Sequence, residues 1–271
     1  MNKTKSGENI GILGGGFVGQ VLKKYWPKAK IFDIKPGEWD RPEDVLGQDY
    51  IFLSINFEDN CASFENRKII EDYLAKVPDG KTIIIKSTLI PGTTDYFQNK
   101  FKKLNFCYNP EFLTEATAWD DFTNPTFQIL GLNADSMSIS DKLFSMLPKA
   151  QYETRMLSTE AEILKHAMNS FFATKVIFFN QLYDACLQYY ADYEKISNIL
   201  TEHPWIGDSH SIVWHKGYRG FGGKCLPKDT KAFAKVSGSS LLKRVLEINE
   251  DLKKNTFRLG DVSEKYHSIE M

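Results

Sequence analysis

The sequence predicts an α/β fold in which a doubly wound parallel sheet is followed by a helical domain. Short apolar runs alternate with amphipathic stretches from Asn9 to about Leu147, which is typical of βα units on a parallel sheet. A glycine-rich turn joins the first run to a helical stretch. At Ser158 the segment STEAE is typical of an N-cap followed by acidic first-turn residues, so a long helix should begin there.

The elements follow from these patterns in chain order. Six strands are expected, namely NIGILG, AKIFDI, DYIFLS, KTIIIKS, NFCYN and FQILGL. Amphipathic periodicity predicts covering helices over 18–25, 64–76, 93–102 and 135–147. After the short run AQYETRM, the long helix can extend to about Tyr190, and its apolar residues cover more than one face, which suits a core or dimer helix.

Further helices are expected over 193–200 and, after a Gly-rich loop at 217–223, over 228–254. The predicted domains are therefore 1–157 for the sheet and 158–255 for the helical part, with a polar tail over 256–271.

Bulk composition excludes several classes of protein. The 271 residues include 34 basic and 35 acidic side chains, so no global field favours nucleic acid or an anionic membrane. Neither a signal peptide nor an uncharged membrane span is recognisable, which predicts a soluble cytoplasmic protein. The four cysteines at 61, 107, 186 and 225 lack paired metal-ligand spacing, so neither disulfides nor a metal site is expected.

A cofactor fingerprint follows the first strand. The segment GGGFVG at 14–19 fits GxGxxG between a strand and a helical stretch, and Asp33 ends the next strand. Backbone N–H groups there can approach a pyrophosphate, while an acid at the second strand binds the adenosine ribose and disfavours NADP. A tight turn is the simpler interpretation of a lone GxGxxG. The combined context favours a Rossmann-like NAD site formed by Gly14, Gly16, Phe17, Val18, Gly19 and Asp33.

Four further segments carry a family resemblance. They are Ser87-Thr88 with PGTT at 91–94, NPEFLTE at 109–115, Ala161-Glu162 with Lys165 and Asn169, and GFGGKCLPKD at 220–229. Together with the glycine loop, they resemble the UDP-glucose and GDP-mannose 6-dehydrogenase family from about Ile10 to Asn249, and CLPKD leans slightly towards the GDP-mannose branch.

The resemblance implies oxidation of a sugar C6 alcohol to a carboxylate with two NAD, without release of the aldehyde. Cys225 would be the nucleophile that passes through a thiohemiacetal and a thioester. Lys224 and Lys228 could lower the pKa of its thiol, whereas the other cysteines are interpreted as small apolar side chains. Lys165 and Asn169 stand four residues apart and would stabilise an oxyanion.

The remaining expected roles are also implied by the resemblance. Asp229 would activate a water and help to hold Lys165, although an N-cap role beside Thr230 is an alternative. Glu111 and Thr88 would bind the same water, with an ordinary loop position as the alternative for Glu111. Near the nicotinamide the expected residues are Ser87, Thr88 and Glu115, and Lys228 is a further expected cofactor-binding residue. The expected substrate-binding residues are Phe112, Leu113, Lys165, Asn169, Trp214, Lys216 and Gly222.

The sequence also departs from the family pattern. A third domain that helps to bind the nucleotide sugar is not recognisable, which makes the chain look like a shortened form. Lys224 replaces a small residue, His210 lies near the place of a partner-subunit Arg, and Ser54-Ile55-Asn56 replaces a Thr-Pro loop. The chemistry is therefore predicted more firmly than the substrate, which is expected to be a nucleotide sugar.

Two other functions remain open. A β-hydroxyacid dehydrogenase acting on a smaller substrate would share the NAD fold and the Lys-xxx-Asn pair but would need no cysteine. A non-catalytic NAD-binding subunit would keep only the fold. In each case the helix over 158–190 is expected to form a homodimer interface.

Overall fold

A computed structural model describes residues 9–56, 64–215 and 217–254. The predictions made for Cys61, Lys216 and the tail over 256–271 lie outside these ranges. The chain divides into two compact units, Met1–His166 and Ala167–Met271. The domain boundary placed at 157 and 158 stays a prediction.

The first unit is built on a seven-stranded sheet with the order β2-β1-β3-β4-β5-β6-β7. The strands are β1 Ile10–Leu13, β2 Lys30–Phe32, β3 Tyr50–Leu53, β4 Thr82–Ile85, β5 Asn105–Tyr108, β6 Phe127–Leu132 and β7 Tyr152–Leu157. Every neighbouring pair in the series β2-β1-β3-β4-β5 is parallel. β2 lies on one side of β1 and β3 on the other, so the connections from these strands run in opposite directions across the sheet. In sheets of this kind, ligands bind at the carboxyl ends of the strands where this change of direction occurs.

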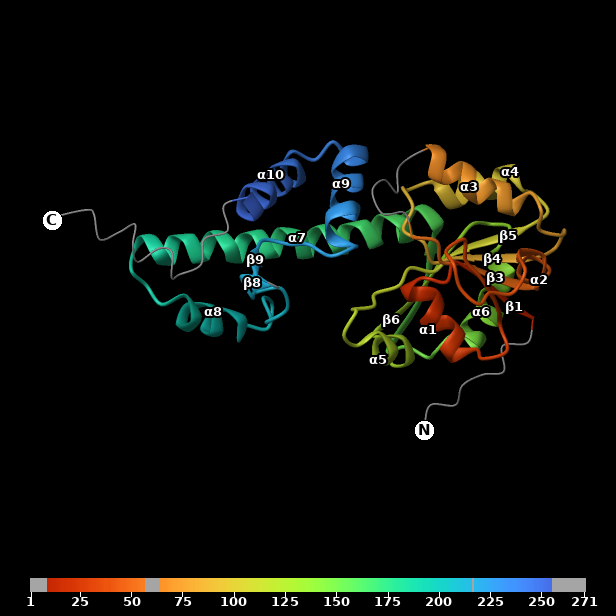
Figure 1. The fold of residues 1–271 in the computed structure, drawn as a ribbon, viewed down its shortest axis with the longest axis horizontal. Helices are drawn as coiled ribbons and strands as arrows, with labels where there is room; N and C mark the ends of the chain where they lie inside the picture. The colour runs from red at the N-terminus through yellow and green to blue at the C-terminus, as the bar shows by residue number, and fades with distance from the viewer. Residues whose placement is uncertain (1–8, 57–63, 216, 255–271) are drawn as a thin grey trace. The chain divides into compact units, whose positions relative to one another are not determined.

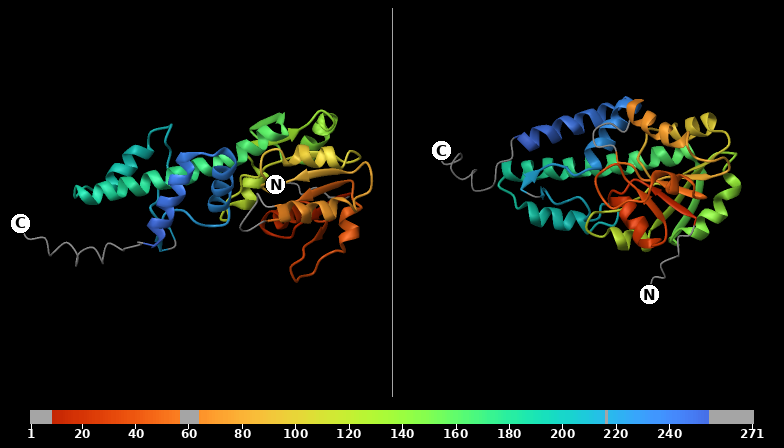
Figure 2. Two further views of the ribbon diagram at one scale, coloured as in Figure 1. Left: turned by 90° about the horizontal axis from the view of Figure 1, so that it is seen from above. Right: turned by 45° about the vertical axis from the view of Figure 1, so that its right-hand side comes forward.

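Helices cover both faces of this sheet (Figures 1 and 2). They are α1 Phe17–Tyr25, α2 Pro42–Leu46, α3 Phe64–Leu74, α4 Thr93–Lys100, α5 Ala118–Thr123 and α6 Ser140–Met146, with a short 3-10 turn at Met137–Ile139. One core packs α2, α3 and α4 on the sheet, and the second packs α1, α5 and α6 on the other face. Alternate strand residues enter different cores, as Ile83 and Ile84 do, which explains the continuous apolar runs.

The first unit differs from the sequence-based expectations in three ways, the last of them being two helices that were not predicted. The run AQYETRM contains β7, which pairs in parallel with β6 although most of its residues are exposed. The sheet is not wholly parallel, because β5 and β6 pair antiparallel through Tyr108 and Gly131. Helices α2 and α5 are too short, at 5 and 6 residues, to give a clear periodic signal.

The second unit is organised around the long helix α7 Ser158–Gln188, whose first turns belong to the first unit. Its start at Ser158 confirms the prediction. The helices α8 Tyr193–Thr201, α9 Leu226–Ser237 and α10 Ser240–Lys254 follow, with a small hairpin of β8 Trp214–His215 and β9 Tyr218–Arg219 before α9. The single helix expected over 228–254 was wrong, because Gly238 adopts a left-handed conformation at φ +69° and ends α9.

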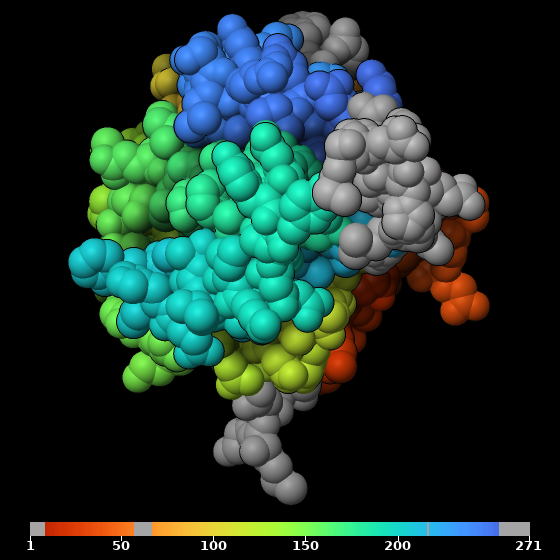
Figure 3. All heavy atoms as spheres, turned by 90° about the vertical axis from the view of Figure 1, so that its left-hand side faces the viewer, coloured from red at the N-terminus to blue at the C-terminus, as the bar shows by residue number. Residues whose placement is uncertain are grey.

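A small apolar core joins α7 to α10 and to the loop before α9. Its buried members are Ala173, Val176, Ile177, Phe221, Val245 and Leu252. Figure 3 shows the blue surface of α10 directly against the green-to-cyan surface of α7. Among the described residues, no helix is both long enough and apolar enough to cross a membrane.

Candidate active site

The glycine loop follows β1 and leads into α1. Gly14 has φ +109°, and a Cβ there would lie 2.6 Å from the carbonyl of Ser54, so only glycine fits this turn. A Cβ at Gly19 would meet the carbonyl oxygen of Gly14 at 1.9 Å, which shows how closely α1 approaches the loop. Gly16, by contrast, has nothing within 4 Å of the Cβ position. The open side of Gly16 lets a ligand approach the backbone at the start of α1.

The N-terminus of α1 suits an anion. Its first turn carries no acidic residue, and Phe17 and Val18 present their N–H groups there beside exposed or half-buried side chains. Such unpaired N–H groups and the helix dipole favour a phosphate. Asp33 lies at the end of β2 and accepts hydrogen bonds from the N–H groups of Gly15 at 2.6 Å and Lys35 at 2.8 Å. These residues therefore fit the pyrophosphate and ribose of a dinucleotide.

Two loops at the carboxyl ends of β4 and β5 carry the next predicted residues. Ser87 and Thr88 follow β4 and are buried, and the Ser87 hydroxyl donates to the carbonyl of Leu53 at 3.2 Å. Glu111 follows β5 and meets the ammonium of Lys165, which donates to the Glu111 carbonyl at 2.6 Å and to its carboxylate at 3.3 Å. The same ammonium lies 5.3 Å from the centre of the Phe112 ring. The structure thus brings Glu111, Phe112 and Lys165 together.

Cys225 occupies the N-cap of α9 in the second unit, and its side chain is exposed. Pro227 in the first turn favours the start of a helix here. The sulfur therefore lies at the positive end of a 12-residue helix, where a thiolate is stabilised by the helix dipole. The exposure of this thiol suits attack on a substrate, whereas Cys107 and Cys186 are buried.

Asp229 lies one turn beyond Cys225 and is fully buried. Its carboxylate accepts from the amide of Asn169 at 2.5 Å and from the ammonium of Lys228 at 2.6 Å. The alternative that Asp229 is an N-cap was wrong, because the cap is Cys225 and Asp229 belongs to the first turn of the helix. The structure therefore brings Asn169 and Lys228 to the carboxylate of Asp229, in the first turn of the helix that Cys225 caps.

Residues that sequence reasoning did not single out hold the Gly-rich loop before Cys225. The buried Asn249 accepts from the N–H of Phe221 at 2.6 Å, and the buried Asn180 accepts from the N–H of Gly220 at 3.3 Å. Arg219 donates to Asn180 at 2.8 Å and pairs with Asp184 at 2.6 Å. Buried amides inside apolar helices were the available signal, because such groups need partners.

The predicted substrate-binding residues belong to both units. Phe112 and Leu113 pack partly buried against the two cores of the first unit. Trp214 lies in β8 with its ring 6.5 Å from that of Tyr183, which is a packing contact within the second unit. A Cβ at Gly222 would lie 2.1 Å from the hydroxyl of Tyr218, so this glycine also serves local packing.

Two further predicted positions have contrasting surroundings. Glu115 is exposed in the loop after β5. His210 has φ +64° and stacks on Phe172 with ring centres 4.4 Å apart. Burial lowers the pKa of His210, with the charge of Lys175 acting in the same direction, so the neutral ring is favoured in this stack.

Two buried ionisable groups of the first unit were also not singled out by sequence reasoning. Lys86, at the end of β4, is 4% exposed, and burial lowers the pKa of its ammonium to about 8. Glu162, in the second turn of α7, is fully buried, and burial raises the pKa of its carboxyl to about 7 although Thr94 and Gly92 donate hydrogen bonds to it. Perturbed groups of this kind often cluster at functional sites.

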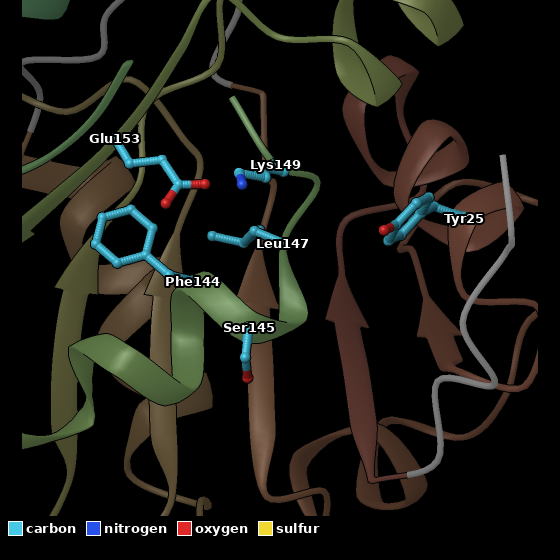
Figure 4. A pocket seen from close by; sticks show the side chains of 6 residues that line it. All are labelled: Tyr25, Phe144, Ser145, Leu147, Lys149 and Glu153. Atoms are coloured by element: carbon cyan, nitrogen blue, oxygen red, sulfur yellow. The ribbon is translucent and has the colours of Figure 1, made fainter. Parts of the chain in front are cut away.

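A cavity of about 460 Å³ lies elsewhere on the first unit (Figure 4). Its lining comes from the end of α1, from α6 and the loop after it, and from β7, namely Tyr25, Phe144, Ser145, Leu147, Lys149 and Glu153. None of these is a predicted site residue, and Tyr25 is at the opposite end of α1 from the glycine loop.

Comparison with known proteins identifies the family. Residues 61–147 match the NAD binding domain of the UDP-glucose/GDP-mannose dehydrogenase family, and residues 159–251 match its central domain. The chain belongs to this family. The resemblance drawn from the sequence motifs is therefore confirmed, as is the NAD-binding character of the first unit.

Curated relatives include the UDP-glucose 6-dehydrogenases of Rickettsia conorii, 29% identical over 87% of this chain and 58% of the relative, and of Rickettsia bellii, 31% identical over 77% and 51%. The chain thus spans about half the length of the curated relatives it matches.

Among solved structures, a UDP-glucose dehydrogenase from Pyrobaculum islandicum has a TM-score of 0.76 at 22% identity, covering 93% of this chain and 69% of that one. A 3-hydroxyisobutyrate dehydrogenase from Mycobacterium tuberculosis has a TM-score of 0.69 at 14% identity, covering 91% and 94%. These two likenesses confirm the predicted fold class, a Rossmann-like sheet followed by a helical domain.

Proposed function

We propose that this chain carries the NAD-binding and thiol-bearing parts of a sugar-nucleotide 6-dehydrogenase, which oxidises a C6 alcohol to a carboxylate. The overall reaction consumes one alcohol, one water and two NAD, and it yields one carboxylic acid, two NADH and two protons. The exposed Cys225 at the N-cap of α9, one turn from a buried Asn169–Asp229–Lys228 cluster, is the observation that carries this proposal.

NAD, when bound, supplies the hydride acceptor for both oxidation steps. The sulfur of Cys225 adds to the carbonyl carbon of the aldehyde, forming a C–S bond and an oxyanion. Oxidation of this thiohemiacetal gives a thioester, and water then breaks the C–S bond to release the acid and return the thiolate. A covalent link explains how the aldehyde stays bound between two oxidations.

The other residues have roles that suit their chemistry. Lys165 and Asn169 supply an ammonium and an amide N–H, which stabilise developing negative charge on oxygen. Asp229 and Glu111 are carboxylates able to accept a proton from the alcohol or from water, with Thr88 as a further partner of that water. Lys228, held 2.6 Å from Asp229, balances its charge and contributes to the cofactor end of the site.

Ser87 and Glu115 are further proposed nicotinamide-end residues, and Phe112, Leu113, Trp214, Lys216 and Gly222 are proposed to line the sugar nucleotide. The nucleotide sugar itself is a proposal drawn from the named relatives.

The test combines kinetics with mass spectrometry. The protein is incubated with NAD and a panel of UDP- and GDP-sugars, and two NADH per sugar acid are expected. Cys225→Ala should stall after the first oxidation and form no acid, while wild type treated with substrate should carry an adduct on Cys225. A Cys107→Ala variant is the matched control, because that thiol is buried. Full four-electron turnover by Cys225→Ala would contradict the mechanism.

The same assay separates the alternatives. A β-hydroxyacid dehydrogenase would produce one NADH per substrate and would keep its activity in Cys225→Ala. A non-catalytic subunit would bind NAD and produce no NADH with any sugar nucleotide. The fold does not distinguish these functions, since a UDP-glucose dehydrogenase and a 3-hydroxyisobutyrate dehydrogenase both superpose on this chain.

We also propose that α7 forms a homodimer interface. Phe171 and Phe178 are 63% and 56% exposed on this helix, and they are seven residues apart, which places them on one face. Exposed aromatic residues aligned in this way are typical of helix association. Light scattering should give twice the mass of the 31.1 kDa chain, and Phe171→Glu should give the monomer mass.

A further inference from the structure

The first two turns of α7 are bound to the loop that follows β4. Glu162 accepts from the N–H of Gly92 at 2.5 Å and from the N–H and hydroxyl of Thr94 at 2.9 and 2.7 Å. His166, one turn later, lies with Nε2 3.0 Å from the carbonyl oxygen of Leu89. Glu162 and His166 are both fully buried. The loop over 87–94 is therefore held from both its middle and its end.

These contacts come from one face of α7. Thr159 donates from its hydroxyl to Asp95 at 2.9 Å, and positions 159, 162 and 166 follow the i, i+3, i+7 spacing of a single helix face. Lys165, between the last two, donates instead to Glu111 in the loop after β5. One short helical segment thus fixes the loops at the carboxyl ends of two adjacent strands.

The chemistry of the Glu162 contact requires a carboxylate. Gly92 is the N-cap of α4 and Thr94 is in its first turn, so their N–H groups lack partners within the helix. A carboxylate oxygen accepts from each of them and also complements the helix dipole. A glutamine has the same shape, but its NH₂ group would face an N–H donor on one side. The single oxygen of the glutamine could accept from only one of the two N–H groups, of Gly92 or of Thr94, in the present geometry.

We propose that Glu162 and His166 are positioning residues, which hold the loop bearing Ser87 and Thr88 in register with Lys165 and so shape the nicotinamide end of the cofactor site. This inference rests on the proposed function, because Ser87 and Thr88 are proposed to meet the nicotinamide. It predicts that loosening the loop affects the nicotinamide half of the dinucleotide and spares the adenosine half, which binds at Gly16 and Asp33.

The experiment compares NAD with ADP-ribose, which lacks the nicotinamide, by calorimetry on the whole chain at about pH 8.5, above the pKa of about 7 of the Glu162 carboxyl, so that this side chain is ionised. Glu162→Gln should raise the dissociation constant of NAD about tenfold, the scale of one lost charge-assisted hydrogen bond, and change that of ADP-ribose less than about twofold. His166→Leu, which removes the donor to the Leu89 carbonyl, should act in the same direction and serves as the second variant if Glu162→Gln folds poorly. Hydrogen exchange of ligand-free protein should be faster over 87–94 in both variants.

The matched control is Glu71→Gln. Glu71 is also buried and bonds the same helix α4, accepting from the Tyr96 hydroxyl at 2.7 Å and pairing with Lys100 at 2.8 Å. This variant should leave the ratio of the two dissociation constants unchanged. Equal weakening of NAD and ADP-ribose by Glu162→Gln, or unchanged exchange over 87–94, would overturn the inference. If the wild type binds neither ligand, the proposed function itself is contradicted. If the wild type binds both ligands and both variants keep its NAD affinity, only the positioning role is contradicted.

Discussion

Lys86 provides a stability prediction whose size follows from its burial. Its side chain is buried at the end of β4, and its ammonium lies 5.8 Å from the centre of the Phe122 ring. Burial lowers the pKa from 10.5 to about 8, although the carboxylate of Glu111 acts in the opposite direction. The folded protein therefore binds this proton less tightly than the unfolded chain does.

The magnitude is the difference in pKa multiplied by 1.36 kcal/mol, which is about 3 kcal/mol. Between the two pKa values the unfolded chain carries more protons than the folded one, so stability rises with pH in this window. The cost of burying Lys86 is full below pH 8, and about 1 kcal/mol of it remains at pH 9.5. Lys86→Met keeps the volume and removes the charge.

Urea unfolding followed by tryptophan fluorescence should therefore show Lys86→Met more stable than wild type by about 3 kcal/mol at pH 7 and by about 1 kcal/mol at pH 9.5. Lys102→Met is the control, because Lys102 is exposed, and it should change stability by less than about 0.5 kcal/mol at both pH values. A Lys86→Met protein that is less stable than wild type, or a gain that does not depend on pH, would refute the reasoning.

Two further predictions concern the glycine-rich loops. Asn249→Ala should lower the free energy of unfolding by about 1–3 kcal/mol because it leaves the buried N–H of Phe221 without its acceptor; Asn198→Ala, at an exposed position, should change it little in the same urea titration. Asp33→Asn should improve NADP binding relative to NAD roughly tenfold, or about 1.4 kcal/mol, since the carboxylate charge next to Gly15 is removed; an unchanged NADP/NAD ratio of dissociation constants would contradict the role given to Asp33.

Local signals in the sequence predicted much of the first unit. The glycine loop was recognisable because Gly14 and Gly19 occupy places where any side chain would strike the backbone. The alternating apolar runs predicted six of the strands, and Ser158 predicted the start of α7 to the residue. The thiol motif at Cys225 was identified from its resemblance alone, since its N-cap position depends on where α9 begins.

Other features depend on residues that are distant in the chain. Glu162 meets Gly92 across 70 positions and Phe221 meets Asn249 across 28, so no local window contains both partners. The antiparallel pairing of β5 with β6 and the burial of Lys86 are likewise consequences of packing.

The sequence by itself therefore determined the fold class, the dinucleotide loop and the family. Each of these can be recognised from short runs of consecutive residues, namely apolar strands, the glycine turn and the family motifs. Only the tertiary structure decided which buried polar groups hold the loops, because a buried donor or acceptor finds its partner through the packing of distant segments.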